Sequence, residues 1–233
     1  MVKDELVQRS PVRIFEQSIH GGLKAGEIGI IAAPSGIGKT SVLVQIALDK
    51  LLQGRKVIHI SYTKHTDYVL AWYEDIFDEF IKKKNLENPE EVKNEAVRNR
   101  VLLKFSQEGM SGEQVRRSLM ALIRDGGFNA EAIIVDGFDF SLQDPGRFAR
   151  ARDMAAELSV SIWYSCTTRD GDDCDKHGIP AMLRDALPSI DVIIALDPRA
   201  DHIGLKVRKD RDQFNPERMA LKLDPKTLLI LEG

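Results

Sequence analysis

The residues from Ala33 to Thr40 have the types and spacing of a loop that binds phosphate. They follow the pattern G-x-x-x-x-G-K-S/T, with alanine in place of the first glycine. Glycines let consecutive backbone N–H groups turn inward and hold phosphate oxygens without a Cβ in the way. Lys39 would reach the β- and γ-phosphates of a nucleotide, and the Thr40 hydroxyl would hold Mg²⁺. The predicted nucleotide-contacting residues are Ala33, Pro34, Ser35, Gly36, Ile37, Gly38, Lys39, Thr40 and Ser41.

The segments on either side of this loop favour phosphate binding over a turn without a ligand. The apolar run at 28–33 predicts a strand, and apolar residues at helical spacing from Val42 to Leu51 predict a helix that ends near Gly54. A helix that begins near Lys39 points the positive end of its dipole at a bound anion. Ala33 fits this arrangement, because its methyl group is tolerated where the loop begins with a negative φ.

An aspartate closes the fully apolar run at 132–136. A strand that is apolar on both faces is typical of the centre of a parallel sheet. Asp136 would then lie near the crevice where ligands bind in open α/β sheets, outside the carboxyl ends of the strands. We therefore predict that Thr40 and Asp136 order one Mg²⁺ ion and that the cofactors are ATP and Mg²⁺.

Length and composition indicate one soluble domain. The 233 residues are 43% hydrophobic and 30% charged, so we predict a single domain over residues 1–233, of which 1–20 are an N-terminal lead-in. No run approaches the about 20 apolar residues of a membrane span. The N-terminus has no apolar segment of the secretory type. We expect no membrane association.

The cysteines and the net charge indicate the compartment and the kinds of ligand that the protein could bind. Cys166 and Cys174 are the two cysteines, and they do not form a C-x-x-C pair, which argues against a zinc site and favours reduced thiols in the cytoplasm. The formal net charge of −3 lacks the bulk basic signature of a dedicated nucleic-acid binder, although a local basic patch is compatible with it. The loop at 167–178 is rich in aspartate, and it is either a metal site or a solvated loop.

Periodicity along the chain predicts alternating strands and helices. A strand, helix and strand over 28–63 form a parallel βαβ unit. His59 alternates with apolar neighbours, which favours a packed histidine of a strand over a ligand. A hairpin turn is expected at 224–226. Further strands are predicted at 101–105, 132–136, 160–165, 191–196, 202–211, 219–223 and 227–231, and further helices at 66–84, after 89, from 111 to 126, and at 147–158.

The segment at 22–27, which reads GLKAGE, stands ahead of the phosphate loop and resembles the opening of RecA-like ATPases. The resemblance is to the KaiC, RadA and DnaB-helicase branch, and most of all to a KaiC-type ATPase domain. It continues through Ile133–Asp136, Ser165–Arg169 and Asp191–Leu196, and it covers roughly residues 10–231. It closes at 209–211, which resembles the lysine–x–arginine finger of that branch.

The resemblance implies an α/β fold of the three-layer P-loop NTPase type. That fold has a mainly parallel sheet with helices on both faces and a C-terminal antiparallel hairpin. It also implies a homo-oligomer, either a ring or a filament, with ATP between neighbouring subunits. Lys39 and Asp136 would then be catalytic residues, and Lys209 and Arg211 would neutralise phosphate charge in the adjacent subunit.

This chain departs from the family pattern where hydrolysis is concerned. The second core strand of the family ends near a glutamate that activates water, whereas this chain has no carboxylate between Ser61 and Asp67. Asp67, Glu74 and Glu108 are the carboxylates that could substitute. The helicase-type Ser-Gln pair is replaced by Ser165-Cys166, and the run after Asp136 is also altered.

Three functions fit these observations. The first is a Mg·ATP-binding protein with weak or regulated hydrolysis that is coupled to assembly. The second is a nucleotide-gated scaffold that hydrolyses nothing, which the missing glutamate favours. The third is a DNA-associated recombinase or helicase-accessory ATPase. It rests on fold analogy, and the charge balance argues against it because duplex binding relies on lysine and arginine contacts to phosphate.

Overall fold

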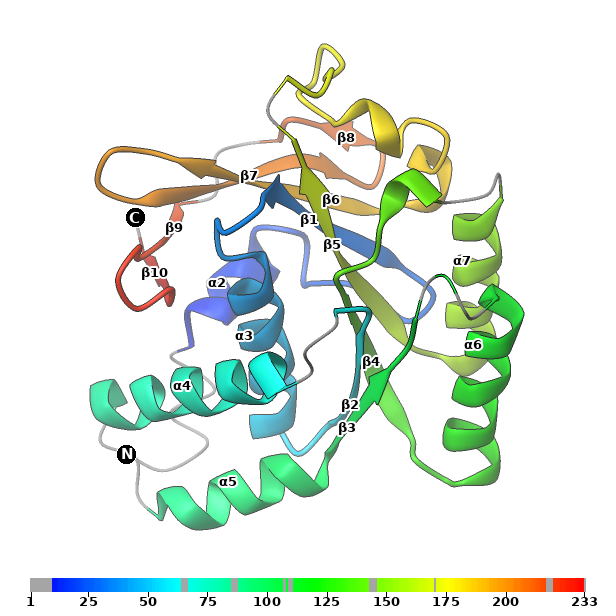
Figure 1. The fold of residues 1–233 in the computed structure, drawn as a ribbon. Coiled ribbons are helices and arrows are strands. Elements are labelled where there is room, and N and C mark those ends of the chain that lie inside the picture. Colours follow the sequence, from blue (N-terminus) through cyan, green and yellow to red (C-terminus); the bar gives the residue numbers. More distant parts are fainter. Residues whose placement is uncertain are drawn as a thin grey trace.

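The computed structural model describes residues 10–63, 67–84, 88–106, 108, 111–142, 146–169, 171–216 and 220–232. Within these ranges, one mixed sheet of ten strands runs through the molecule, in the order β10-β9-β7-β6-β1-β5-β4-β2-β3, with β8 paired to β7 (Figure 1). The strands are β1 (Ile28–Pro34), β2 (Lys56–Ser61), β3 (Arg100–Lys104), β4 (Ala130–Asp136), β5 (Ser161–Thr168), β6 (Val192–Pro198), β7 (Ile203–Asp210), β8 (Gln213–Phe214), β9 (Leu221–Leu223) and β10 (Ile230–Glu232).

The core of the sheet is parallel. Strands β3, β2, β4, β5, β1 and β6 pair in parallel, and β7, β9 and β10 continue the sheet in antiparallel pairs. The predicted βαβ unit is confirmed in that β1 and β2 run parallel, and β5 and β4 lie between them. The carboxyl ends of β1 and β4 therefore meet at one edge of the sheet, where parallel α/β proteins place their ligands.

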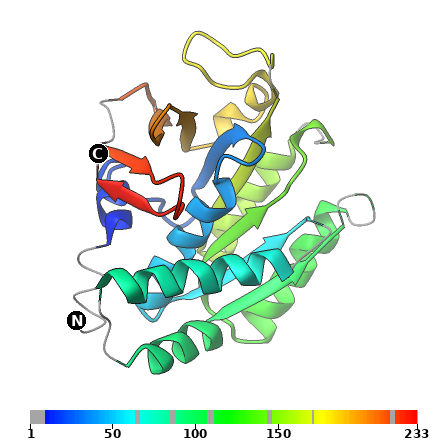
Figure 2. The ribbon, with the colours of Figure 1, turned by 60° about the vertical axis from the view of Figure 1, so that its left-hand side comes forward.

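Helices cover both faces of the sheet (Figures 1 and 2). The apolar residues of α3 and α4 form one buried cluster with one face of the sheet, and α6 and α7 form a second cluster with the opposite face. A π-helical turn at Ala121–Asp125 extends α6 to Gly126. The α-helices are α2 (Pro11–Gln17), α3 (Lys39–Leu52), α4 (Asp67–Lys84), α5 (Pro89–Arg98), α6 (Gly112–Met120) and α7 (Arg147–Leu158).

Two predicted segments differ from the structure. The expected lead-in contains the helix α2, whose Val12 and Phe15 are buried against the core. The expected strand at 227–231 begins only at Ile230, because the Asp224 carboxylate accepts hydrogen bonds from Lys226 N and Thr227 Oγ1 and holds the chain in a longer turn. Parts of other predictions lie outside the described residues, namely 1–9, 64–66, 170 and 219.

Candidate functional site

The candidate phosphate loop joins the end of β1 to the start of α3. Gly36 and Gly38 have φ values of 80° and 101°, which favour glycine. A Cβ on Gly36 would point into open space, whereas one on Gly38 would lie 2.5 Å from Leu223 Cδ2. Ala33 belongs to β1 and is not among the residues with positive φ, so the alanine in the first glycine position causes no backbone strain.

The first turn of α3 presents backbone N–H groups without a side-chain cap. Its N-cap is Gly38, which has no side chain to cap this end of the helix. The first N–H groups of a helix have no partner within the helix, and the helix dipole adds partial positive charge at the same place. These are the properties that bind phosphate at a helix N-terminus.

Lys39 lies folded against this loop. Its Nζ donates to Ala33 O at 2.9 Å and to Pro34 O at 2.7 Å. The residue is 8% exposed, and burial lowers the pKa of its ammonium group, an effect that the nearby Asp136 carboxylate opposes. A buried cation held by neutral carbonyl oxygens is suited to exchange them for phosphate oxygens, because an anion offsets its charge and a carbonyl does not.

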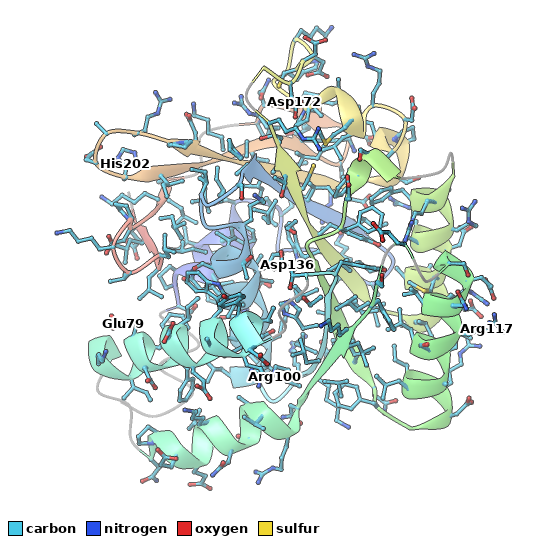
Figure 3. The ribbon with its side chains drawn as sticks, in the orientation of Figure 1. Glu79, Arg100, Arg117, Asp136, Asp172 and His202 are labelled. Atoms are coloured by element: carbon cyan, nitrogen blue, oxygen red, sulfur yellow. The ribbon has the colours of Figure 1, made fainter. Side chains whose placement is uncertain are left out.

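Asp136 ends β4 on the side of the sheet that faces α3 (Figure 3). Its Oδ2 accepts a hydrogen bond of 2.9 Å from Thr40 Oγ1, so the structure brings together the two residues predicted to order Mg²⁺. Asp136 is 5% exposed. A hydroxyl and a carboxylate are hard oxygen donors, and Mg²⁺ is usually bound by one or two such groups together with phosphates and water. The donor set therefore fits this ion.

The end of β2 lies beside Asp136 and carries hydroxyl groups. Ser61 is in register with Asp136 across the pair of strands, and Ser61 Oγ is 2.7 Å from Thr63 Oγ1. Of the three carboxylates that could substitute for the missing glutamate, Asp67 begins α4, Glu74 lies further along it, and Glu108 follows β3. All three are exposed. Among the described residues, no carboxylate occupies the end of β2.

The pair Ser165-Cys166 is divided between the two faces of the sheet. Ser165 Oγ accepts a hydrogen bond of 2.9 Å from Gly137 N, which ties β5 to the residue after Asp136. Cys166 is fully buried in the cluster on the opposite face, and burial raises the pKa of its thiol to about 12. The cysteine is therefore a neutral core residue.

A contact that the sequence analysis missed joins the phosphate-loop helix to the C-terminal hairpin. Ser41 Oγ and Gln45 Nε2 donate to Leu228 O at 2.6 and 2.9 Å, and Ile230 N donates to Gln45 Oε1 at 2.8 Å. Gln45 is 1% exposed, and its amide replaces strand partners for two backbone groups of the hairpin. The sequence offered one signal for this contact, namely a glutamine on the apolar side of a predicted helix.

Lys209 and Arg211, the two candidates for the finger, both hydrogen-bond to groups of their own chain. Arg211 donates to both carboxylate oxygens of Glu27, at 3.2 and 2.7 Å, and to Asp210 Oδ1 at 2.5 Å. The carbonyl oxygens of Ile19 and Gly22 accept two further bonds, both of 2.8 Å. Lys209 Nζ donates to a backbone carbonyl, Ile190 O. Neither residue lies in the cluster formed by Lys39, Thr40 and Asp136, so a role at a nucleotide would require a second subunit.

The fold and this edge of the sheet define an α/β protein with a mixed, mainly parallel sheet. No protein-family model matches the chain, and none of the curated proteins matches it significantly. Across the described part of the chain, no helix combines the length and the apolar character needed to cross a bilayer. No group of three or more acidic, histidine or cysteine side chains within that part is placed to hold a metal ion, and this includes residues 167–169 and 171–178 of the aspartate-rich loop.

Proposed function

We propose that this protein binds Mg·ATP at the phosphate loop as a RecA-like P-loop NTPase of KaiC type. The observation that carries the proposal is the meeting of Lys39, Thr40 and Asp136 at the carboxyl edge of the sheet, with Thr40 Oγ1 2.9 Å from Asp136 Oδ2. The uncapped N-terminus of α3 supports it, because it supplies N–H donors for phosphate oxygens. In this proposal Lys39 pairs with the β- and γ-phosphates, and Thr40 and Asp136 hold the metal.

Thermal and chemical unfolding with and without Mg·ATP test the binding. A ligand present at 100 times its dissociation constant stabilises the folded chain by about 2.7 kcal/mol. We expect that gain for the wild type and none for Lys39→Ala. Lys24→Ala is the matched control, since Lys24 is exposed and precedes the amino end of β1, whereas the loop follows its carboxyl end. An equal gain in the wild type and in Lys39→Ala would exclude the loop as the site.

Hydrolysis is proposed to be weak. Phosphoryl transfer needs positioned phosphates, a metal, an oriented water and charge neutralisation. Ser61 and Thr63 at the end of β2 lack the carboxylate that would orient the water. Placing one there, as Thr63→Glu, is expected to raise the rate of phosphate release by about 10²-fold, in the range of general-base catalysis. Thr63→Gln has the same shape without the charge and should stay at the wild-type rate. A wild-type turnover of tens per second would contradict the proposal.

The lack of a carboxylate at the end of β2 among the described residues also favours a second candidate, a nucleotide-gated scaffold that does not hydrolyse ATP. The two candidates differ in one measurement, the release of phosphate under single-turnover conditions. Complete retention of ATP over hours would favour the scaffold, and slow conversion to ADP would favour the weak ATPase. In both cases we place the protein in the cytoplasm, consistent with its free cysteines Cys166 and Cys174.

Assembly into a ring or a filament is the further part of the proposal. Use of Arg211 as a finger would require its release from Glu27 and Asp210, whereas Lys209 would have to leave only a carbonyl oxygen. Light scattering of the wild type and of Lys209→Ala, each with and without an ATP analogue, tests this part. Growth of the particle with the analogue in the wild type alone would support a finger, and a monomer under all conditions would exclude assembly.

A further inference from the structure

A cavity of about 530 Å³ lies under α6 and α7, on the face of the sheet opposite α3. Ile60, Val135 and Ile162 of the strands form its floor, and Leu119 of α6 and Met154 of α7 contribute to its walls. Small-molecule sites usually have volumes of about 300–1,000 Å³, whereas ordinary interiors contain few voids larger than a water molecule. The apolar floor holds water poorly, so this part of the cavity suits the apolar body of a ligand.

Aromatic rings line the cavity at the carboxyl edge of the sheet. The ring centroids of Phe138 and Tyr164 are 5.9 Å apart, those of Phe148 and Tyr164 are 5.2 Å apart, and those of Tyr62 and Phe138 are 5.6 Å apart. All four rings belong to the residues that line the cavity. Ring edges and faces at these separations offer large contact areas to an aromatic or aliphatic group.

Arg147, the first residue of α7, brings a positive charge to the same end of the cavity. Its guanidinium carbon lies 4.4 Å from the centroid of the Phe138 ring, and its charge opposes the effect of burial, which raises the pKa of the Tyr62 hydroxyl. Among the described residues, no carboxylate lies within ion-pair distance of Arg147. By contrast Arg116, which also lines the cavity, is paired with Glu157 at 2.9 Å. The Arg147 guanidinium is planar, is held over a ring and can donate two parallel N–H bonds to a carboxylate.

Acidic residues limit the charge of the ligand. Glu113, Asp153 and Glu157 are part of the cavity lining and face any bound anion from α6 and α7. Glu157 is paired with Arg116 and Arg124, and Glu113 is paired with Arg116 at 3.5 Å. Asp153 has no ion-pair partner among the described residues, and its charge remains to repel multiply charged groups. A polyphosphate would therefore be disfavoured here, whereas a single carboxylate can pair with Arg147.

We propose that this cavity is a second binding site and that it takes a small amphipathic monoanion. Its apolar body would lie under α6 and α7, and its carboxylate would pair with the Arg147 guanidinium. The proposal is independent of nucleotide binding, because none of its residues belongs to the phosphate loop. Two kinds of ligand share this chemistry, namely aromatic carboxylates and medium-chain fatty acids.

Calorimetric titration of the whole chain with 2-naphthoate and with decanoate tests the site. We expect saturable binding of one molecule per chain for at least one of the two, and the tighter ligand identifies the kind of body. The neutral 2-naphthylmethanol should bind at least tenfold more weakly than 2-naphthoate. Absence of saturable binding for both carboxylates would overturn the proposal.

Substitution of Arg147 separates charge recognition from packing. Arg147→Met keeps an unbranched chain over Phe138 but removes the charge, so it should weaken carboxylate binding by tenfold or more, equivalent to about 1.4 kcal/mol, and change binding of the alcohol less than twofold. Arg117→Met is the matched control, because Arg117 is exposed on α6 and points away from the sheet (Figure 3). Equal losses for the carboxylate and the alcohol would overturn the role of Arg147.

Two further measurements keep the test valid if a variant fails to fold. In wild-type protein with labelled methionine methyl groups, 2-naphthoate should shift the Met154 resonance and leave Met182, which lies outside the lining, in place. The Lys39→Ala variant should bind the carboxylate as the wild type does. A shift of Met182 alone, or loss of binding in Lys39→Ala, would place the probe elsewhere and overturn the proposal.

Discussion

Lys39 and Arg211 are both cations that the sequence analysis predicted to contact phosphate. In the structure they hydrogen-bond to different kinds of partner. Lys39 is bound by two neutral carbonyl oxygens, Ala33 O and Pro34 O. Arg211 is bound by two carboxylates, Glu27 and Asp210, as well as by two carbonyl oxygens. The charge of Arg211 is thus balanced within the chain, whereas no carboxylate of the described residues hydrogen-bonds to Lys39.

This difference indicates which region is prepared for a ligand. A carboxylate and a guanidinium that share several hydrogen bonds stabilise each other, and removing one leaves the other uncompensated. An ammonium group on carbonyl oxygens can exchange them for an anion and gain charge-assisted bonds. We therefore propose that the Lys39 region binds the ligand and that the Arg211 region stabilises the fold of the isolated chain.

The largest effect is expected from Arg211→Ala. The Asp210 side chain is fully buried, and without Arg211 it keeps His20 as its described ion-pair partner. Loss of one partner of a buried pair costs about 3 kcal/mol or more, so the free energy of unfolding in urea should fall by about that amount. Arg199→Ala removes an exposed pair with Asp197 and should cost less than about 1 kcal/mol. Similar small losses in both variants would contradict the bracing role.

A smaller effect is expected from acid, through His59. Burial lowers the pKa of His59 to about 4, and smaller influences of Asp136 and Arg100 act in opposite directions. The unfolded chain therefore takes up a proton near pH 6.5, before the folded chain does. Stability is complete above that pH and is lost as the pH falls towards 4.

Urea unfolding at pH 7.5 and at pH 5 measures this loss. We expect about 2 kcal/mol from His59, given 1.36 kcal/mol per pH unit below the unfolded pKa. His59→Gln should be less sensitive to acid than the wild type by that amount. The same pH sensitivity in both proteins would show that His59 does not stay neutral in the folded state.

The smallest effect concerns the contact between α3 and the hairpin. Gln45→Met keeps the volume but leaves Leu228 O and Ile230 N without this amide partner. Buried backbone groups that lose a partner cost about 1–3 kcal/mol, and water at the end of the hairpin reduces this, so we expect about 1.5 kcal/mol. Hydrogen exchange should localise the change to the hairpin. An unchanged exchange rate at Ile230 would contradict the contact.

Much of the fold could be predicted from local patterns. The apolar runs that end at Ala33 and Asp136 are central strands, and the helix after Lys39 begins where its glycines indicated. These features depend on neighbours in sequence, since a parallel strand buried on both faces must be apolar throughout. The sequence analysis treated this region as a lead-in and did not predict α2, although Ser10 as a cap and Pro11 in the first turn are the local signals for it.

The rest depends on residues far apart in the chain. The partner of Arg211, Glu27, is 184 positions away, and nothing local marks the pair. The cavity could not be predicted from the sequence either, because residues such as Ile133, Leu119 and Phe148 have the same apolar pattern whether they fill a core or line a cavity. Periodicity gives the face of an element, but the distance between two packed elements depends on all the side chains between them.

A structure of the chain with a Mg·ATP analogue tests the central claim most directly. The account predicts that Lys39 Nζ leaves Ala33 O and Pro34 O and lies within about 3 Å of β- and γ-phosphate oxygens. Thr40 Oγ1 should then lie about 2.1 Å from Mg²⁺, and Asp136 should hydrogen-bond to the metal or its water. A nucleotide bound elsewhere, or a Lys39 that still donates to both carbonyl oxygens beside bound phosphate, would contradict the account.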